Sequence, residues 1–455
     1  MLIKMSPLGL TTLCSLAFMS GCSSLNPPSH SESNLNPLVP TQWDNAQPYV
    51  NSDFSTQLLE LVNNDELSTL VFETLESNYD LKQTALRLQQ ADLLASQSSN
   101  YLQPSLSTSY QASRDKSPTI SNNHKLSLDL SWELDVWGRL ADKSSAASSR
   151  AQSAQLDYLY ARNSLAARVI QAWLDIQYRA EIINVEKQWI VSLLDTEEVI
   201  TSQVLDGSKE HADLDTARAA TERVKASLVS RQQQQLAAIR DLNALRGNIS
   251  KDHQISSHSL PTVPTPILKL PGEMVGSRPD LLAAYQSLLA ADADTSVAYK
   301  ELLPKITLSA SLYRSGTSPN AMSQNPSLWN LMGGITAPIF NQNSIETNAK
   351  VTALKAQESF INYEKKLVSA INEVSTALDK EYYLTLQEQH YKDAKKYSNS
   401  SMKNYESLYQ EGASDIIALL VAKQSVYQST IQLLQTQQAR FSNRVSLGLA
   451  LGMGV

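Results

Sequence analysis

The sequence predicts an α+β membrane protein built from two tandem structural repeats, each with a pair of β-strands followed by a long helical hairpin. Three observations support this prediction. The two halves share residues at a nearly constant offset, four short runs alternate between apolar and polar side chains, and two very long stretches lack both glycine and proline. Alternation with a period of two is typical of a strand with one apolar face, whereas an uninterrupted stretch without glycine or proline favours a helix.

The duplication is visible as matching residues that keep their order along the chain. Internal repeats of this kind determine the architecture, because each copy is one structural unit. Matches that run in order through helical, proline and glycine positions indicate two copies of one fold. The matched pairs include Asp80 and Asp280, Leu81 and Leu281, Leu102 and Leu302, and Pro104 and Pro304 at an offset of 200, and Gly207 and Gly412, and Gly247 and Gly452, at an offset of 205.

The clearest strand pattern runs from Lys125 to Val136, where every second side chain is apolar. Strands of about 9 to 11 residues with one apolar face are long enough to cross a bilayer when tilted. Four such strands cannot close a barrel, because the smallest known barrels have eight, and an open edge in hydrocarbon leaves backbone groups without partners. The chain is therefore expected to oligomerise, giving eight strands in a dimer or twelve, with room for a channel, in a trimer.

Long helices are expected after each strand pair. Residues 139–206 and 342–411 contain neither glycine nor proline. At 1.5 Å per residue, each stretch could extend about 100 Å. Gly207 and Gly412 then mark turns, after which a second glycine-free and proline-free stretch runs back.

These patterns divide the chain into five segments. The segments are a signal peptide at 1–21, a lipidated tether at 22–53, a first repeat at 54–247 with strands at about 102–136 and a helical hairpin at 138–247, a connector at 248–277, and a second repeat at 278–455 with strands at about 303–340, a helical hairpin at 342–447 and a C-terminal tail.

The N-terminus has the order of a secretory signal: Lys4, an apolar run from Leu8 to Met19, then Ser20 and Gly21 before Cys22. The apolar run, at about 12 residues, is too short to span a bilayer as a helix. The stretch before Cys22 resembles a bacterial lipoprotein signal, in which cleavage leaves the cysteine as a lipid-bearing first residue. The alternative is a plain signal peptide followed by an incidental cysteine.

Composition excludes several classes of function. Hydrophobic residues make up 42% of the chain, which is enough for a sizeable core, and the net charge of −7 has the wrong sign for a nucleic-acid binder. Cys14 would leave with the signal and Cys22 would carry lipid, so no thiol remains for a disulfide, a metal or catalysis. His253 and His258 lie close together in the connector, where a solvated pair is a simpler interpretation than a metal site. We expect neither a metal nor a cofactor.

Three acids on one strand could suggest acid–base catalysis. Asp129, Glu133 and Asp135 fall on the polar side of the alternation. The wall of a water-filled lumen explains carboxylates on one strand face more simply than an active site does. Because the chain also lacks a glycine-rich phosphate loop and a Gly-x-Ser-x-Gly elbow, it is not expected to be an enzyme.

Two segments resemble a known family. GSRPDLLAAYQSLLAADAD followed by LLPKITLSAS at 276–311, and LSWELDVWGRL at 130–140, are similar to TolC-like outer membrane factors of the RND/NodT type. These proteins are the outer-membrane lipoprotein ducts of tripartite efflux pumps. The resemblance implies a homotrimer with a twelve-stranded transmembrane barrel, a twelve-helix periplasmic tunnel and an equatorial belt at the connector.

The resemblance also implies partners and a place in the cell. The protein is expected in the outer membrane, anchored by lipid at Cys22, with a long periplasmic extension. It would conduct small molecules passively, because an inner-membrane pump supplies the energy through a periplasmic adaptor. The adaptor would meet the helical tips near Gly207 and Gly412.

Relatives commonly narrow the duct with acidic residues after the second tip, where this chain has Ala418 and Val421. Gln424 stands where some relatives have arginine. We therefore expect Ile417 and Val421 to close the aperture by apolar contact, which gates a channel by dewetting.

Asp415 is the remaining candidate for an acidic ring, with Asp213 and Asp215 as its counterparts in the first repeat. Each of these acids could instead be a helix N-terminal charge, which the helix dipole favours.

Two other functions stay open from the sequence. The same architecture could serve as the outer-membrane channel of a type I (ABC) protein secretion system, or the chain could be a lipid-anchored coiled-coil protein without a pore. The apolar-faced strands argue against the second, because a periplasmic spacer does not need them. A duct imposes little chemical selection, so the sequence does not specify the exported compounds or the cognate pump.

Overall fold

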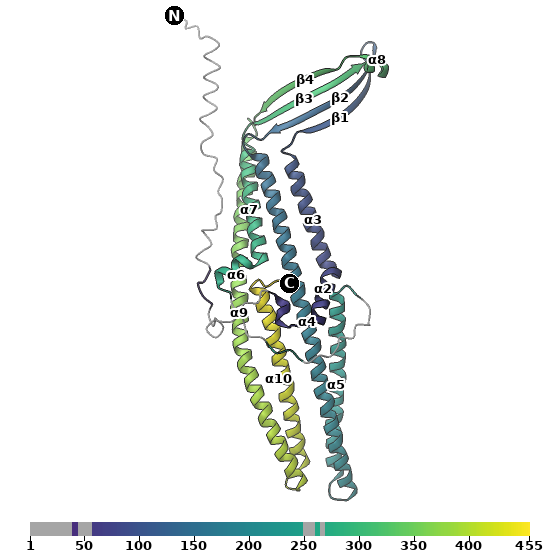
Figure 1. The fold of residues 1–455 in the computed structure, drawn as a ribbon, viewed down its shortest axis with the longest axis vertical. Helices are drawn as coiled ribbons and strands as arrows, with labels where there is room; N and C mark the ends of the chain where they lie inside the picture. Colours follow the sequence, from purple (N-terminus) through teal and green to yellow (C-terminus); the bar gives the residue numbers. More distant parts are fainter. Residues whose placement is uncertain (1–38, 44–56, 249–259, 264–268) are drawn as a thin grey trace. The chain divides into compact units, whose positions relative to one another are not determined.

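The computed structural model describes residues 39–43, 57–248, 260–263 and 269–455 (Figure 1). The predicted signal peptide, Cys22, most of the tether, and the His253 and His258 pair lie outside the described residues. The described chain divides into two compact units. The first contains Arg87–Gln155 and Ala283–Lys365, and the second contains Leu156–Leu282, Lys366–Val455 and the segment that ends at Leu86.

Two tandem repeats are evident in the order of the elements, because α3-β1-β2-α4-α5 recurs as α7-β3-β4-α9-α10 with α8 inserted between the second pair of strands. The elements are η3 (Leu58–Leu61), α2 (Asp65–Ser77), α3 (Tyr79–Asn100), β1 (Ser105–Lys116), β2 (Ile120–Leu134), α4 (Arg139–Leu205), α5 (His211–Leu245), α6 (Pro271–Ser277), α7 (Pro279–Lys300), β3 (Lys305–Gly316), α8 (Pro319–Gln324), β4 (Leu328–Thr336), α9 (Gln342–Gln410) and α10 (Ile416–Ala450). None of the helices among the described residues carries an apolar run long enough to cross a membrane.

The first unit contains one antiparallel sheet in the order β1-β2-β3-β4, with β1 and β4 at its edges (Figure 1). The register places apolar side chains of neighbouring strands opposite one another, as where Leu128 faces Leu312 and Leu312 faces Trp329. Side chains on this face remain exposed, including Leu331 at 63% and Ile335 at 75% of their surface. A contiguous apolar face of this kind requires a lipid or protein environment.

The strands differ from the predicted runs at their ends. The second strand begins at Ile120 rather than near 125, and it ends at Leu134 rather than at 136. The fourth strand ends at Thr336, shortly before Pro338, which has no N–H to donate to a ladder. The segment between β3 and β4 contains α8, which packs so closely on Gly316 that a Cβ there would lie 2.5 Å from the Met322 nitrogen.

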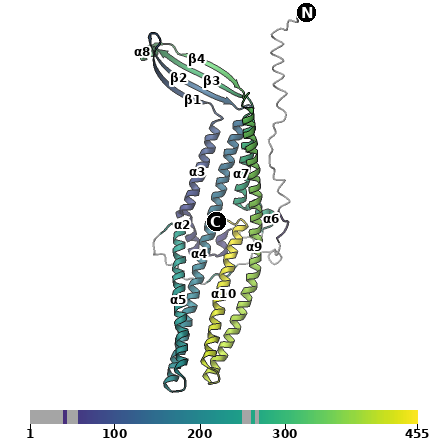
Figure 2. The same ribbon diagram turned by 180° about the vertical axis from the view of Figure 1, so that it is seen from behind.

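The four glycines matched between the repeats end four helices in the same way. At the end of α4, Gly207 has φ +72°, and the Ser208 N–H donates to the Gln203 carbonyl at 2.9 Å. At the end of α9, Gly412 has φ +73°, and the Ala413 N–H donates to the Leu408 carbonyl at 2.8 Å. This left-handed glycine turn satisfies carbonyls that lack a partner within the helix. It turns the chain from α4 into α5 and from α9 into α10, which lie side by side as two hairpins (Figure 2).

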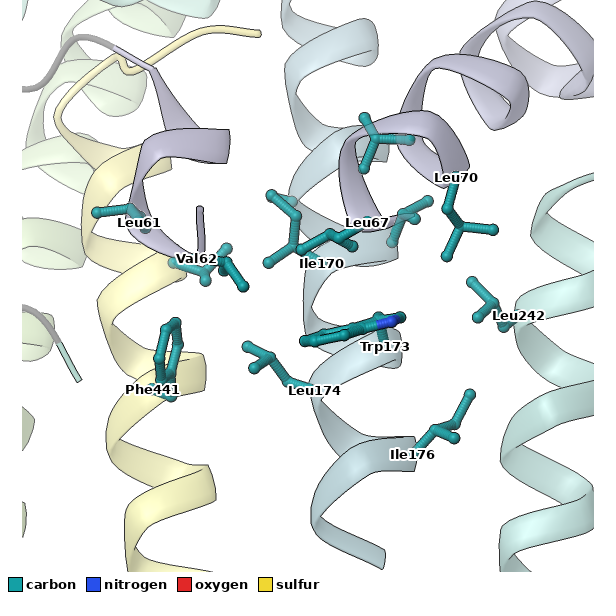
Figure 3. Close-up of a cluster of buried hydrophobic side chains, with 14 of the residues drawn as sticks. Leu61, Val62, Leu67, Leu70, Ile170, Trp173, Leu174, Ile176, Leu242 and Phe441 are labelled. Carbon is teal, nitrogen blue, oxygen red and sulfur yellow. The ribbon is translucent and has the colours of Figure 1, made fainter. Parts of the chain in front are cut away.

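The largest hydrophobic core of the second unit surrounds α4. Trp173, with 1% of its surface exposed, lies at its centre (Figure 3). Other members come from α4 itself and from η3, α2, α5 and α10, and they include Leu61, Leu67, Leu70, Ile170, Leu174, Leu242 and Phe441.

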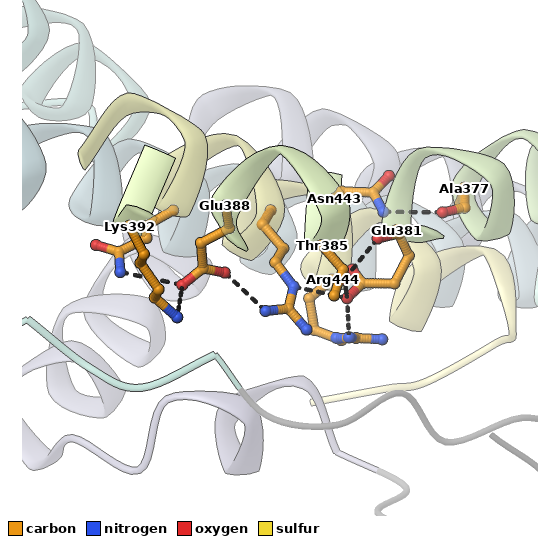
Figure 4. Close-up of polar contacts among 9 residues, drawn as sticks. Ala377, Glu381, Thr385, Glu388, Lys392, Asn443 and Arg444 are labelled. Carbon is orange, nitrogen blue, oxygen red and sulfur yellow. Dashed lines mark hydrogen bonds and ion pairs between the residues drawn. The ribbon is translucent and has the colours of Figure 1, made fainter. Parts of the chain in front are cut away.

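A buried ionic network joins α9 to α10 (Figure 4). Arg440 Nε donates to Glu381 at 2.8 Å and its Nη1 donates to Glu388 at 2.7 Å. Arg444 lies 2.7 Å from Glu381, and Lys392 lies 2.8 Å from Glu388. Removing one partner of a buried ion pair costs about 3 to 5 kcal/mol, because the other charge stays buried.

This network predicts a pH-dependent stability. Burial alone would raise the pKa of Glu388, but hydrogen bonds from Lys392, Arg440 and Gln437 outweigh it and lower the pKa from 4.5 to about 2. Because the folded-state pKa lies below the ordinary value, ionised Glu388 stabilises the fold above pH 4.5, and this stability is lost as the pH falls towards about 2. Glu388→Gln should therefore lower the apparent Tm at pH 7, and its difference from wild type should shrink as the pH approaches 2.

The measurement is thermal unfolding of the detergent-solubilised protein followed by circular dichroism across pH 2 to 7. Glu358→Gln, at an exposed position of the same helix, is the matched control and should match wild type throughout. A Glu388→Gln defect of constant size at every pH would contradict the assignment.

Candidate functional site

The polar face of the sheet carries a cluster of hydroxyls around one carboxylate. Ser109 Oγ and Ser127 Oγ lie 2.9 Å apart across β1 and β2. Ser127 Oγ donates to Asp129 Oδ2 at 2.6 Å, and Ser311 Oγ on β3 donates to Asp129 Oδ1. Asp129 therefore lies where the alternation predicted it, on the face opposite the apolar side chains. Its carboxylate accepts one hydrogen bond from its own strand and one from β3.

The other two predicted strand acids serve the junction between β2 and α4. Glu133 accepts from Arg139 Nη2 at 2.8 Å, which links the end of the strand to the first residue of the helix. Asp135 lies beyond the end of β2, so placing it on the strand was wrong. Its carboxylate accepts from the backbone N–H groups of Leu140 at 2.9 Å and Ala141 at 2.8 Å. The first N–H groups of a helix have no partner within the helix, and a carboxylate placed there satisfies them.

The same junction joins the two repeats within the first unit. Trp137 Nε1 donates to the Pro304 carbonyl at 2.8 Å, and Lys300 Nζ donates to Asp142 at 2.6 Å. Trp137 and Pro304 belong to the two sequence segments that carry the family resemblance. Those segments therefore hold the base of the sheet to the helices that follow it.

At the second helical tip, Asp415 is the N-cap of α10. Its Oδ1 accepts from the Ala418 N–H at 2.7 Å, which is the arrangement expected of a helix N-terminal charge. In the first repeat, Asp213 lies in the first turn of α5 and Asp215 is exposed. The Asp415 carboxylate thus caps its own helix, whereas Asp215 is exposed to solvent in the single chain.

The three other aperture candidates share one face of α10. Ile417, Val421 and Gln424 follow one another at intervals of four and three residues and are all exposed, Ile417 at 54% and Val421 at 60%. Such spacing places side chains on one side of a helix. The buried side of α10 carries Leu419 and Leu420, which pack on α4 and α5 residues of the tip core. An exposed apolar pair beside a helical tip can close an opening when copies of the chain come together.

Two contacts that the sequence did not predict hold the hairpins together near the tips. The Tyr409 hydroxyl donates to Gln203 Oε1 at 2.6 Å. Lys423 is buried, and its Nζ donates to Thr196 Oγ1 at 2.9 Å. Burial lowers the pKa of Lys423. No sequence signal pointed to these residues, because their partners lie about two hundred positions away.

Known proteins resemble this chain in both sequence and fold. A family model described as outer membrane efflux protein matches residues 70–248 and 270–453. The cation efflux system protein CusC of Escherichia coli O6:H1 is 26% identical over 469 residues, covering 99% of each chain. The probable outer membrane lipoprotein SilC of Salmonella typhimurium is 26% identical over 466 residues, also covering 99% of each chain.

A solved structure shares the fold. The outer-membrane channel OprN superposes with a TM-score of 0.88 over 94% of this chain and 99% of that chain, at 21% sequence identity. With the four-stranded sheet and the two helical hairpins, this likeness confirms the predicted α+β fold class built from two repeats.

Proposed function

Because the chain belongs to the outer membrane efflux protein family, we propose that it is the outer-membrane exit duct of a tripartite efflux pump. It conducts small molecules passively from a periplasmic adaptor and an inner-membrane pump to the exterior. Three copies complete the duct, so that twelve strands close a barrel in the outer membrane and twelve helices continue it into the periplasm. The adaptor contacts the helical tips around Gly207 and Gly412.

The exposed apolar face of the sheet, bounded by two open edges, carries this proposal. Among the described residues, β1 pairs only with β2 and β4 pairs only with β3. In hydrocarbon each unsatisfied backbone group costs several kcal/mol, so the edges need strands of another copy. Closure of three four-stranded sheets supplies these partners and directs the Asp129 face towards water.

Exposed apolar side chains on helices of the first unit support the same assembly. Leu93 and Leu94 on α3 are 70% and 61% exposed, and Leu354 and Ile361 on α9 are 65% and 55% exposed. The two α9 residues lie seven positions apart, which puts them on one helix face. Helix faces of this kind suit side-by-side packing between copies.

The duct is tested in outer-membrane fractions and in cells. We expect a trimer band that collapses to a monomer on heating, and deletion of the gene should raise the intracellular accumulation of at least one class among dyes, detergents, antibiotics and metals. Leu128→Arg on the apolar face should abolish the trimer, because a cation at the bilayer midplane costs about 2 to 4 kcal/mol. Ser107→Arg, on the polar face opposite Asp129, is the matched control and should assemble. A water-soluble monomer in both variants and wild type would contradict the proposal.

We also propose that Cys22 carries the lipid anchor, as the residues before it indicate. Cells fed labelled palmitate should label the wild-type protein and the Cys14→Ser variant, whereas Cys22→Ser should remain unlabelled. Label that persists in Cys22→Ser would rule out this attachment point.

The aperture is closed by Ile417 and Val421 from three copies, and their exposed positions on α10 support this arrangement. Val421→Asp should hydrate the constriction and introduce negative charge, so the closed-state leak in planar bilayers should rise and favour cations. Val229→Asp makes the same change at a position on α5 that is 65% exposed, and it should leave the leak unchanged. An unaltered leak in Val421→Asp would show that Val421 does not line the aperture.

A further inference from the structure

A groove of about 1020 Å³ in the second unit plays no part in the aperture, the sheet or the tips. Its size matches the upper range of small-molecule sites. Residues of α4, α9 and α10 line it, together with Arg278 between α6 and α7. On α4 the lining residues Ser164, Arg168 and Gln171 lie on a different side from Trp173, which faces the main core.

Two hydrogen-bonded ties make α10 the floor of this groove. Gln171 Nε2 on α4 donates to Ser446 Oγ at 2.9 Å and to the Ser442 carbonyl at 3.2 Å. On the other side, Asn443 Nδ2 donates to the Ala377 carbonyl of α9 at 2.8 Å (Figure 4). The helix α10 is therefore held to both neighbours, and α4 and α9 form opposite walls.

Each wall contributes one exposed cation, Arg168 from α4 and Lys380 from α9. Within the part of the chain that the structure describes, neither makes an ion pair. Between them the lining offers hydroxyl donors from Thr376 and Ser442 and apolar surface from Leu384. Two cations flanking a partly apolar surface suit an anion that has an apolar body.

The end of the groove at Arg278 has the opposite character. Arg278 donates to Asp280 at 2.8 Å and to Glu373 at 2.9 Å, so two carboxylates surround one guanidinium. An anionic ligand is repelled from this end and is directed towards Arg168 and Lys380. The groove therefore has an excess of negative charge at its Arg278 end and an excess of positive charge between Arg168 and Lys380.

We infer that this groove is a binding station for small organic anions, held between Arg168 and Lys380 with their apolar part on α10. The inference rests on the proposed function, because it requires the groove to open towards the molecules that the duct conducts. Nothing in the sheet or the aperture specifies a substrate class, whereas the groove favours organic anions. Binding is weak and reversible, because both cations remain hydrated in the empty groove.

The test is isothermal titration of the purified trimer with naphthalene-1,5-disulfonate, a rigid aromatic dianion. Wild type should bind it saturably, and added salt should weaken the binding. Arg168→Gln and Lys380→Gln should each weaken it about tenfold, as expected for loss of one charge-assisted hydrogen bond. Glu373→Gln should bind at least as tightly as wild type, because it removes a repulsive charge. Methyl viologen, an aromatic dication, should not bind there.

Matched controls separate the groove from the net charge of the protein. Arg162→Gln on α4 and Lys403→Gln on α9 make the same charge changes outside the lining and should leave binding unchanged. No saturable binding by wild type, equal weakening in the controls, or equal affinity for methyl viologen would each overturn the inference. Conductance of the same trimer in planar bilayers tests the duct separately. A trimer that conducts but does not bind the dianion would overturn the proposed binding in the groove and leave the proposed duct standing.

Discussion

Backbone hydrogen bonding at the edges of a four-stranded sheet is the constraint on which the proposed assembly depends. The outer face of the sheet is apolar and exposed, so it belongs in lipid, where no water replaces a missing partner. One chain leaves the free sides of β1 and β4 unpaired within the described residues. Within the described residues the sheet has only these four strands, so none is left to pair with its two edges. In the proposed assembly, identical copies supply the missing partners and enclose a passage at the same time.

The helical part obeys a different constraint. Long helices gain stability by burying a face, and here each long helix is paired with a returning helix that begins after a glycine turn. Around α4 the partners supply aliphatic and aromatic groups, whereas between α9 and α10 they also supply the Glu381 and Glu388 ionic network. The two hairpins share a backbone plan and differ in the chemistry of their contacts. The same repeated backbone is therefore stabilised by apolar packing around α4 and additionally by ion pairs between α9 and α10.

Comparison of sequence and structure shows which features short-range patterns reveal. Alternation from Lys125 predicted β2 because its apolar side chains all fall on one face of the sheet. The glycine offset predicted the helix ends because these turns need a residue with positive φ, which glycine adopts without strain. The short helices α6 and α8 were not predicted, although each begins with a proline, Pro271 or Pro319, a residue that favours the first turn of a helix. Asp135 was misplaced because alternation does not show where a strand ends and a capping residue begins. The groove cations Arg168 and Lys380 were invisible, since neither position stands out until two distant helices become opposite walls.

The glycine turns at the tips have a consequence for how such a protein can change. Gly207 and Gly412 each hold their turn through main-chain bonds, and a Cβ at either position would meet no other atom within 4 Å. The bend itself therefore depends on backbone hydrogen bonds and on the positive φ of each glycine, rather than on neighbouring side chains. Substitutions at exposed positions of these two turns can therefore leave the bend intact, so the chemistry that the hairpin ends present can change while the backbone turn persists.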